Sequence, residues 1–344
     1  MGAPTVYDVA ERANVSIATV SRVYRNPGSV REQTRDRVLT VARELGYVPS
    51  GNARGLATNT TGVLGLCFPD HADPELDEIE EQTLYADEIT RGMERAARRH
   101  GYALLIAASL ADGPESLVAS VAGRVDGFAV LARTIATADL ELMVRRLPVV
   151  MIAGPREVDH LDHIEVANAD GERELTTHLI ADHGLRRLAF VGGADDSPDA
   201  DARFLGFQEA LREAGLPVPE EPAERGDFTQ AGGRAATHRL LDRGPLPEAL
   251  VFANDQMAVG AYEVLERRGV RVPADVAVVG FDGIVLGRVV RPSLTTVTQP
   301  MRRLGETAVD LLIERLTEPT RAPRSVLLPV TQTRRASCGC RPPA

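Results

Sequence analysis

Eight short apolar runs, separated by amphipathic stretches, constrain the fold of this chain more than any other feature. In chain order they are VLGLCF, YALLIAA, GFAVLA, PVVMIA, HIEVANA, RLAFVGG, ALVFAND and VAVVGFD. Continuously apolar strands that alternate with helices are typical of parallel sheets covered by helices on both faces. Because eight strands exceed what one doubly wound sheet usually holds, the pattern predicts an α/β fold with two similar subdomains.

The beginning of the chain differs from this pattern, since hydroxyl side chains there precede short helical stretches. Thr5 stands three residues before Asp8, which predicts a capping box and a helix over about 6–13. Ser16 is predicted to cap a second helix over about 17–24. Two helices joined by such a short turn are typical of the helix-turn-helix, whose second helix lies in the major groove of DNA.

A third helix is predicted after the break at Asn26-Pro27-Gly28, and the charge of this region differs from that of the rest. Ser29 and Glu32 have the spacing of a second capping box, and Gly46 is predicted to end the helix. Residues 1–60 contain eight arginines and five acidic residues, whereas the whole chain has a net charge of −10. A basic head on an acidic body indicates a phosphate-bearing partner.

The second helix supplies the side chains that can reach the bases of DNA. The positions expected at base edges are Ser16, Ile17, Ala18 and Ser21. Arg22 can donate two hydrogen bonds to guanine, while Thr19 and Thr34 can reach phosphates. Val20 and Val23 are expected to face inward. The alternative is a small helical cap in which arginine serves only solubility.

The string TVYDVAERANVSIATVSRVYRNPGSVREQTRDRVLTVARELGYVP closely resembles the DNA-binding headpiece of the LacI/GalR family of bacterial transcription regulators, and the resemblance continues through the chain. It implies a headpiece over 1–49, a hinge helix or linker over 50–61, and an effector-binding and dimerisation core over 62–344. In the hinge, Leu56 matches a leucine that enters the minor groove of the operator, and such a wedge kinks DNA. Thr5, Tyr47 and Ala53 complete the candidate DNA-binding residues. Without DNA, the two glycines of the hinge are expected to leave it disordered.

By the same resemblance, the core has a two-lobed arrangement like that of periplasmic binding proteins, built of doubly wound parallel sheets. The first subdomain is expected over about 62–163 and 294–323, and the second over about 164–291 and 324–340. The chain would then cross back between them. On this view, the strand LTTV and the helix near 300–317 join the first subdomain, and SVLLPVTQ joins the second.

A cleft between two α/β lobes is a common ligand site, formed where parallel strands end. Asn254 follows one predicted strand and Asp282 ends the next. By resemblance, both match positions that hydrogen-bond effector hydroxyls, and Phe228 matches an aromatic residue that stacks on the ligand. A carboxylate, an amide and an aromatic face suit a polyol ring, which favours a sugar or a sugar derivative. The alternative is that Asn254 and Asp282 only cap helices.

Two departures from the family pattern bear on the effector. Asp201 stands where the family commonly has an arginine, although Arg203 is retained, so an acceptor-only group replaces a donor-only one. After the first strand, a longer stretch replaces the usual Asn-Pro-aromatic loop, with nine acidic residues between Asp70 and Glu88 and only Tyr85 near the place of the aromatic. These departures leave two alternatives open. The effector carries an amino group or a positive charge, or it is a plain sugar that binds in a different orientation. A solvated acidic helix face is the simpler account of the acidic run.

Other chemistry finds little support in the sequence. No GxGxxG or GxxxxGK[ST] motif follows a strand, and no nucleophile and base have catalytic spacing, so we expect neither an organic cofactor nor enzymatic activity. His160 and His163 form HxxH, and Cys338 and Cys340 form CxC, but neither pair has partners at zinc spacing, so no metal site is expected. Few cysteines, no apolar run of membrane-spanning length and no leader segment favour a cytoplasmic protein.

The sequence thus predicts a homodimeric transcription regulator, in the first place a repressor, that binds a pseudo-palindromic operator and senses a small molecule between its lobes. Three alternatives are open. They are a corepressor-type regulator that senses a non-sugar metabolite, a two-lobed binding protein without a regulatory role, and an enzyme on a doubly wound fold.

Overall fold

The computed structural model describes residues 4–25, 27–48, 60–69, 84–109, 121, 123–132, 134–135, 137–154, 161–195 and 197–340. The chain divides into two compact units, Met1–Gly62 and Val63–Ala344, which we call the headpiece and the core. Over the described ranges, no helix combines the length and the apolar character that crossing a membrane requires.

The headpiece contains the three predicted helices, α1 (Val6–Arg12), α2 (Ile17–Arg25) and α3 (Glu32–Leu45), with the 3-10 turn η1 (Pro27–Ser29) before α3. The capping box at the start of α1 is confirmed, because the Thr5 backbone N–H donates to Asp8 Oδ2 at 2.7 Å and the Thr5 side chain accepts from the Asp8 N–H. The Ser16 cap of α2 is also confirmed, since the Thr19 N–H donates to Ser16 Oγ at 3.2 Å.

The start of α3 differs from the prediction, whereas its end agrees. Arg31, not Ser29, is the N-cap residue, and the Arg31 side chain forms no capping hydrogen bond. The predicted capping box is therefore wrong, because Ser29 belongs to η1 and the α-helical pattern begins only after that turn. Gly46 ends α3 in the left-handed conformation at φ 69°, which glycine adopts at little cost.

The core contains two six-stranded sheets. The first has the order β11-β5-β4-β3-β1-β2 and the second the order β12-β10-β9-β8-β6-β7. The strands of the first sheet are β1 (Val63–Pro69), β2 (Ala103–Ser109), β3 (Gly127–Leu131), β4 (Val149–Ile152), β5 (Asp162–Val166) and β11 (Ser325–Leu328). Those of the second are β6 (Leu188–Gly192), β7 (Glu224–Arg225), β8 (Ala249–Phe252), β9 (Ala277–Asp282), β10 (Thr295–Thr298) and β12 (Thr331–Thr333).

All eight predicted strands are present, as β1 to β6, β8 and β9. Only the β10–β12 ladder is antiparallel among the strand pairs of the described residues, so parallel pairing is confirmed as the rule. Helices accompany the strands, namely α5 (Leu84–Arg99), α7 (Thr137–Val144), α8 (Asn168–Ala181), α9 (Pro198–Glu213), α10 (Gln230–Arg243), α11 (Asp255–Arg267), α12 (Leu286–Val289) and α13 (Met301–Thr317), with the 3-10 turn η2 (Ala336–Cys338) near the C-terminus.

Three strands belong to sheets other than the ones predicted. β5 pairs with β4 and therefore completes the first sheet instead of opening the second. β10 pairs with β9 in the second sheet, not the first, and β11 pairs with β5 in the first sheet, not the second. The assignment of the helix near 300–317 to the first lobe agrees with the structure, and so does that of β12 to the second lobe. A short apolar run does not show which strand it will pair with. The pairing depends on backbone hydrogen bonds to strands that lie far away in the sequence.

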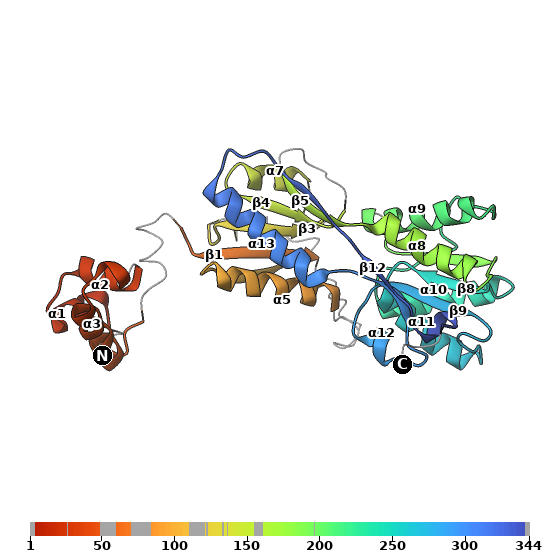
Figure 1. Ribbon diagram of the computed structural model, residues 1–344, viewed down its shortest axis with the longest axis horizontal. Helices are drawn as coiled ribbons and strands as arrows, with labels where there is room; N and C mark the ends of the chain where they lie inside the picture. The colour runs from red at the N-terminus through yellow and green to blue at the C-terminus, as the bar shows by residue number, and fades with distance from the viewer. Residues whose placement is uncertain are drawn as a thin grey trace. The chain divides into compact units, whose positions relative to one another are not determined.

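α13 returns to the first sheet from far along the chain and lies beside α5 (Figure 1). Two glycines permit this close contact. A Cβ at Gly92 would lie 2.0 Å from the carbonyl oxygen of Arg302, and a Cβ at Gly305 would lie 2.1 Å from that of Ile89. At each of these positions a glycine, which has no side chain, allows the backbones of the two helices to come into contact.

A buried carboxylate fixes the segment that follows α13. Asp162, at the start of β5, is 1% exposed. Its oxygens accept from Arg321 Nη2 at 2.7 Å, from the Arg324 N–H at 2.8 Å and from Arg315 Nη2 at 3.2 Å. Because each oxygen has charged or backbone donors, the buried charge is compensated and the chain is held where it enters β11.

Candidate functional site

The surface of α2 combines exposed side chains at its start with a buried apolar side. Val20 and Val23 are 0% and 3% exposed, which confirms the inward orientation predicted for them. Ile17 is 41% exposed although it is large and apolar, and Ser16 and Ala18 are exposed as well. The start of α2 therefore presents its side chains to solvent, as a helix that enters a DNA groove requires.

The arginines of the headpiece differ in what they contact. Arg12 lies 3.8 Å from Glu44, and Arg35 lies 3.6 Å from Glu32. Arg22 is exposed and forms no ion pair with any other described residue. Its guanidinium group is therefore available to a partner outside the chain.

Three hydroxyl-bearing candidates take part in local structure. The Thr5 hydroxyl donates to Asp8 Oδ2 at 2.7 Å. Thr19 Oγ1 lies 3.0 Å from Ser16 Oγ, so these two side chains share one hydrogen bond at the start of α2. Ser21 is half-buried. To contact another molecule, the hydroxyls of Thr5 and Thr19 must therefore either use their remaining hydrogen-bonding capacity or give up these internal hydrogen bonds.

The remaining headpiece candidates are less exposed or lie outside the described residues. Thr34 is half-buried near the start of α3. The Tyr47 ring packs edge-on against Tyr24, with 6.2 Å between ring centres, which joins the end of α3 to α2. Ala53 and Leu56, the hinge candidates, lie outside the described residues.

In the core, Arg203 of α9 is a buried cation with four neighbours. It is 3% exposed. Its Nε donates to Asn168 Oδ1 at 2.8 Å, and its Nη1 donates to the Ala253 carbonyl at 2.5 Å. The guanidinium carbon lies 4.0 Å from the centre of the Phe281 ring, and Nη1 lies 3.6 Å from Asp282 Oδ1. These contacts fix the guanidinium group against the end of β9.

Asp282 is the acid at this position, and its backbone is unusual. Its φ of 118° is rare for a residue with a side chain, and such strain is concentrated at functional sites. Gln299 Nε2 donates to Asp282 Oδ1 at 2.6 Å. Burial raises the pKa of Asp282 to about 6, against the lowering effects of Arg203 and Gln299 and with a further increase from Asp199.

Asn254 and Phe228 lie together beside this cluster. Asn254 Oδ1 accepts from the Met257 N–H at 3.0 Å, so it caps α11, and its Nδ2 donates to the Phe228 carbonyl at 2.9 Å. The Phe228 ring covers Gly193, where a Cβ would lie 2.1 Å from a ring carbon. Asn254 therefore has the capping role that the sequence left open as an alternative, and it also positions Phe228.

Tyr85 and Asp199 bring a second part of the core to the same cluster. The pKa of the Tyr85 phenol is raised, chiefly by burial and then by Asp199 and Asp282, while Arg203 opposes the increase. Tyr85 on α5 is therefore within electrostatic range of acids on α9 and β9. Asp199 Oδ1 accepts from the Gly154 N–H, just after β4, at 2.9 Å. Side chains associated with both sheets thus meet around one set of charges, which we call the cleft cluster.

Comparison with known proteins matches both parts of the chain. Residues 5–50 match the model for bacterial regulatory proteins of the lacI family, and residues 176–338 match that of the periplasmic binding protein-like domain. The ribose operon repressor of Escherichia coli strain K12 is 34% identical over 321 residues, which are 92% of this chain and 94% of that protein. The chain belongs to the lacI family of bacterial regulatory proteins.

Solved structures support this assignment over nearly the whole length of the regulator. The Lac repressor dimer bound to operator and the anti-inducer ONPF superposes with a TM-score of 0.82 at 28% identity, covering 98% of this chain and 99% of that one. The complex of the transcriptional regulator CelR with cellobiose gives a TM-score of 0.71 at 32% identity, covering 97% and 99%. The predicted family, fold class and DNA-binding regulatory function are confirmed.

One predicted effector residue of the regulator is not in the cleft cluster. Asp201 is exposed, whereas Asp199 and Arg203, one helical turn apart on α9, share the face that meets the cluster. The structure therefore does not bring Asp201 to the cleft cluster, and its role in effector binding stays a prediction. The acid that α9 supplies is Asp199, and the side chain two positions further along points to another face.

Further residues complete the cleft cluster, and the sequence did not predict them. Gln299 and Asn168 contact Asp282 and Arg203 directly. Asp255 accepts from the N–H groups of Gly283 and Ile284 at 2.8 and 2.9 Å and so holds the turn after Asp282; burial raises its pKa to about 8, with Asp282 as the second cause. A signal for Asp255 was present, because it follows Asn254 directly at the end of a predicted strand.

In the headpiece, Tyr7 is a further candidate that the sequence did not predict. Its ring is 67% exposed on α1, and an aromatic side chain so accessible on a small domain is available for contact with a partner.

The expectation that the CxC motif lacks partners is wrong. The fold brings His178 and His183 to Cys338 and Cys340. Of the HxxH pair, His163 is buried in β5 and His160 lies outside the described residues.

Proposed function

We propose that this regulator is a repressor that binds a pseudo-palindromic operator as a homodimer, and that a small-molecule effector bound at the cleft cluster controls its affinity for DNA. The effector is a sugar or a sugar derivative. The protein acts in the cytoplasm and catalyses no reaction.

The observation that carries the DNA-binding part is the division of α2 into two sides. Val20 and Val23 are buried, whereas Ile17 and Arg22 are exposed, so the helix is anchored by one side and offers the other to a groove. Arg22 reads a guanine, while Ile17 and Ala18 contact thymine methyl groups. One headpiece contacts few base pairs, and pairing two headpieces on two half-sites supplies the missing specificity.

The chemistry of the cleft cluster supports a polyol as the effector. Gln299 is 3% exposed, and its Oε1 has no hydrogen-bond partner among the described residues although its Nε2 binds Asp282. A buried acceptor without a donor is costly, and a ligand hydroxyl would supply the donor. Asp282 offers a carboxylate beside it, and the Phe228 ring offers an apolar face. The names of relatives point the same way, since they include a ribose operon repressor and a regulator bound to cellobiose.

The proposal is tested in two steps. Selection of binding sequences from a random duplex library should recover an inverted repeat, and the same selection with Arg22→Ala should lose preference at one base pair in each half-site. A thermal-shift screen against ribose, cellobiose and other mono- and disaccharides should then find a sugar that raises the melting temperature of the wild type. That sugar should also change the affinity for the selected repeat.

Two controls separate the parts of the proposal. The shift should be absent in Gln299→Leu and retained in Asp201→Ala, because Asp201 lies away from the cluster. A selection that returns no repeat contradicts the operator claim. A sugar that binds without changing DNA affinity contradicts the regulatory claim.

A further inference from the structure

Four metal-binding side chains converge at the C-terminal end of the second lobe. His178 lies near the end of α8, His183 follows that helix, and Cys338 and Cys340 belong to η2 and the residues after it. One nitrogen or sulfur atom of each residue lies within 4.8 Å of the others. Two of the residues are buried and two are half-exposed. None of them belongs to the cleft cluster.

Four of the six distances between these atoms match the edges of a tetrahedral zinc site, and the other two are no longer than 4.8 Å. His178 Nε2 and His183 Nε2 are 3.2 Å apart. Cys340 Sγ lies 3.5 Å from His178 Nε2 and 3.4 Å from His183 Nε2, and Cys338 Sγ lies 3.7 Å from His178 Nε2. Bonds of about 2.3 Å to sulfur and about 2.0 Å to nitrogen place tetrahedral ligands roughly 3.3 to 3.8 Å apart.

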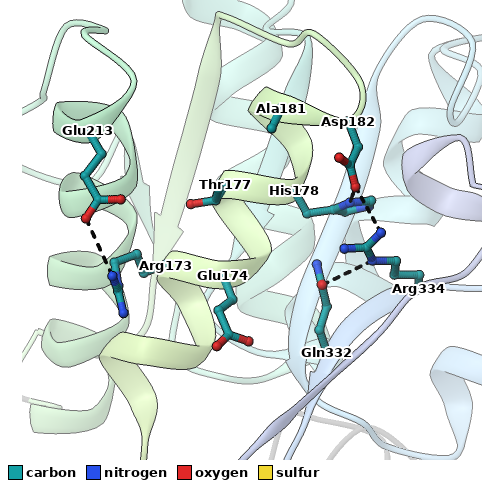
Figure 2. Close-up of a pocket in the computed structure, with 9 residues that line it drawn as sticks. All are labelled: Arg173, Glu174, Thr177, His178, Ala181, Asp182, Glu213, Gln332 and Arg334. Atoms are coloured by element: carbon teal, nitrogen blue, oxygen red, sulfur yellow. Dashed lines mark hydrogen bonds and ion pairs between the residues drawn. The ribbon is translucent and has the colours of Figure 1, made fainter.

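The surroundings of His178 fix which ring nitrogen faces the other three ligands. Its Nδ1 lies 2.8 Å from Asp182 Oδ2, and the same oxygen accepts from Arg334 Nη1 at 2.9 Å. Figure 2 shows the two contacts at the wall of a surface pocket of about 430 Å³, which His178 also lines. A carboxylate on Nδ1 keeps the proton on that nitrogen and leaves Nε2 free as a metal ligand.

One of the two cysteines is also held by a contact that does not involve the histidines. Cys338 is 3% exposed, and its Sγ lies 3.1 Å from Thr295 Oγ1 on β10. Gly339, at φ 98°, provides the turn between the two cysteines. The CxC segment is therefore bent so that both sulfur atoms lie near the histidines of α8 and of the residues that follow it.

We propose that His178, His183, Cys338 and Cys340 bind one Zn²⁺ ion that fastens the C-terminal segment to α8. Four protein ligands leave no open position, which is the arrangement of structural zinc sites. Two thiolates and two neutral imidazoles compensate the charge of the ion. The C-x-C spacing falls outside common zinc motifs, although H-x4-H lies within them. More than 150 residues separate the two pairs, so only the fold brings the four ligands together.

The first test is the metal content of the full-length chain, purified without a histidine tag under thiol-protecting conditions and dialysed against metal-free buffer. Mass spectrometry of the metal should find about one zinc per chain. Cys340→Ser should reduce it to a small fraction. Because Cys340 is half-exposed, this change leaves the buried core intact. Cys67→Ala, which removes the buried cysteine of β1, is the matched control and should keep its zinc.

The second test uses the wild type alone and does not depend on how a variant folds. Removing zinc with a chelator should lower the melting temperature of the core by about 5 °C or more, and adding zinc should restore it. Replacement by Co²⁺ should give the visible absorption of a tetrahedral ion with thiolate ligands. Cys340→Ser should show neither change.

Several outcomes overturn the proposal. One is a wild type that takes up no zinc from a micromolar solution, and another is equal zinc in the wild type and Cys340→Ser. A peptide map that finds Cys338 joined to Cys340 by a disulfide in the zinc-free protein under the same conditions assigns the pair to redox chemistry instead. Preferential uptake of a different metal removes the assignment to zinc.

Discussion

The headpiece and the core present their candidate sites in opposite ways. On α2, Ile17 and Arg22 are exposed, and Arg22 has no charged partner among the described residues. In the cleft cluster, Arg203 and Asp282 are 3% and 4% exposed and contact each other. In the proposed function, DNA contacts an arginine that has no charged partner among the described residues, whereas the effector contacts groups that already hold one another in place.

This difference predicts which property each substitution changes. Replacing Arg22 on the outer side of α2 should weaken DNA binding and leave folding almost unaffected, because Arg22 forms no ion pair with another described residue. A change in the buried polar groups of the core leaves a partner unpaired, so it acts on stability first.

The largest effect is expected for Asp162→Ala. Arg315 and Arg321 would lose their buried counter-ion, and breaking such a pair costs about 3–5 kcal/mol. Urea unfolding of the core measures this loss. Glu314→Ala is the matched control, because Glu314 also contacts Arg321, at 3.8 Å, but is 44% exposed; its effect should stay below about 1 kcal/mol. Equal losses in the two variants would show that burial does not distinguish them.

The next effect concerns pH, through Asp282. Its pKa is about 6 in the folded chain and about 3.9 when unfolded, so the folded state binds the proton more tightly. The resulting stability is fully present below about pH 4 and is lost as the pH rises through 6, which amounts to roughly 3 kcal/mol.

Asp282→Asn should therefore flatten the fall in core stability between pH 4 and 6 relative to the wild type. Urea unfolding midpoints at several pH values measure the pH dependence of core stability. Subtracting the curve of the variant from that of the wild type removes the contributions of other acids. Parallel curves would show that Asp282 titrates in the folded chain as it does in the unfolded one.

The same contrast explains how much the sequence could predict. The caps at Thr5 and Ser16 and the inward side of α2 depend on neighbours within four positions, and the structure agrees with each. The eight strands are also visible as apolar runs. The sheet membership of β10 and β11 depends on pairing with strands far away in the sequence, and the prediction for both was wrong.

Residues that act through distant partners were missed for the same reason. Asp199 and Asp201 look alike in the sequence, and only the direction of α9 relative to Gly154 separates them. Likewise, Cys338 and Cys340 gain their histidine partners only when the chain after β12 lies against α8.

A third prediction tests the headpiece side of the comparison. Arg22→Ala should weaken binding to the selected operator by about 1–3 kcal/mol, and the loss should be confined to one base pair in each half-site. Fluorescence anisotropy with single-base operator variants measures this loss. Headpiece stability should not change, because Arg22 contacts no other described charge. A uniform loss over all operator variants would make Arg22 a phosphate contact instead.

The smallest effect is expected at Ser16, which both supports the fold and is exposed where DNA is expected to bind. Its hydroxyl accepts from the Thr19 N–H and is also exposed at the start of α2. Loss of an N-cap hydroxyl to alanine costs about 1 kcal/mol, whereas glycine at the same position costs only a few tenths.

Comparison of Ser16→Ala with Ser16→Gly therefore separates the two roles, since both remove the hydroxyl but only alanine loses the cap in full. If DNA affinity and the melting temperature of the headpiece fall for alanine and hardly for glycine, Ser16 acts by capping α2. If affinity falls equally in both while stability does not, the hydroxyl itself contacts the operator. The second result would place Ser16 with Arg22 among the side chains that face DNA, and the first would show that it acts through the fold, as the N-cap of α2.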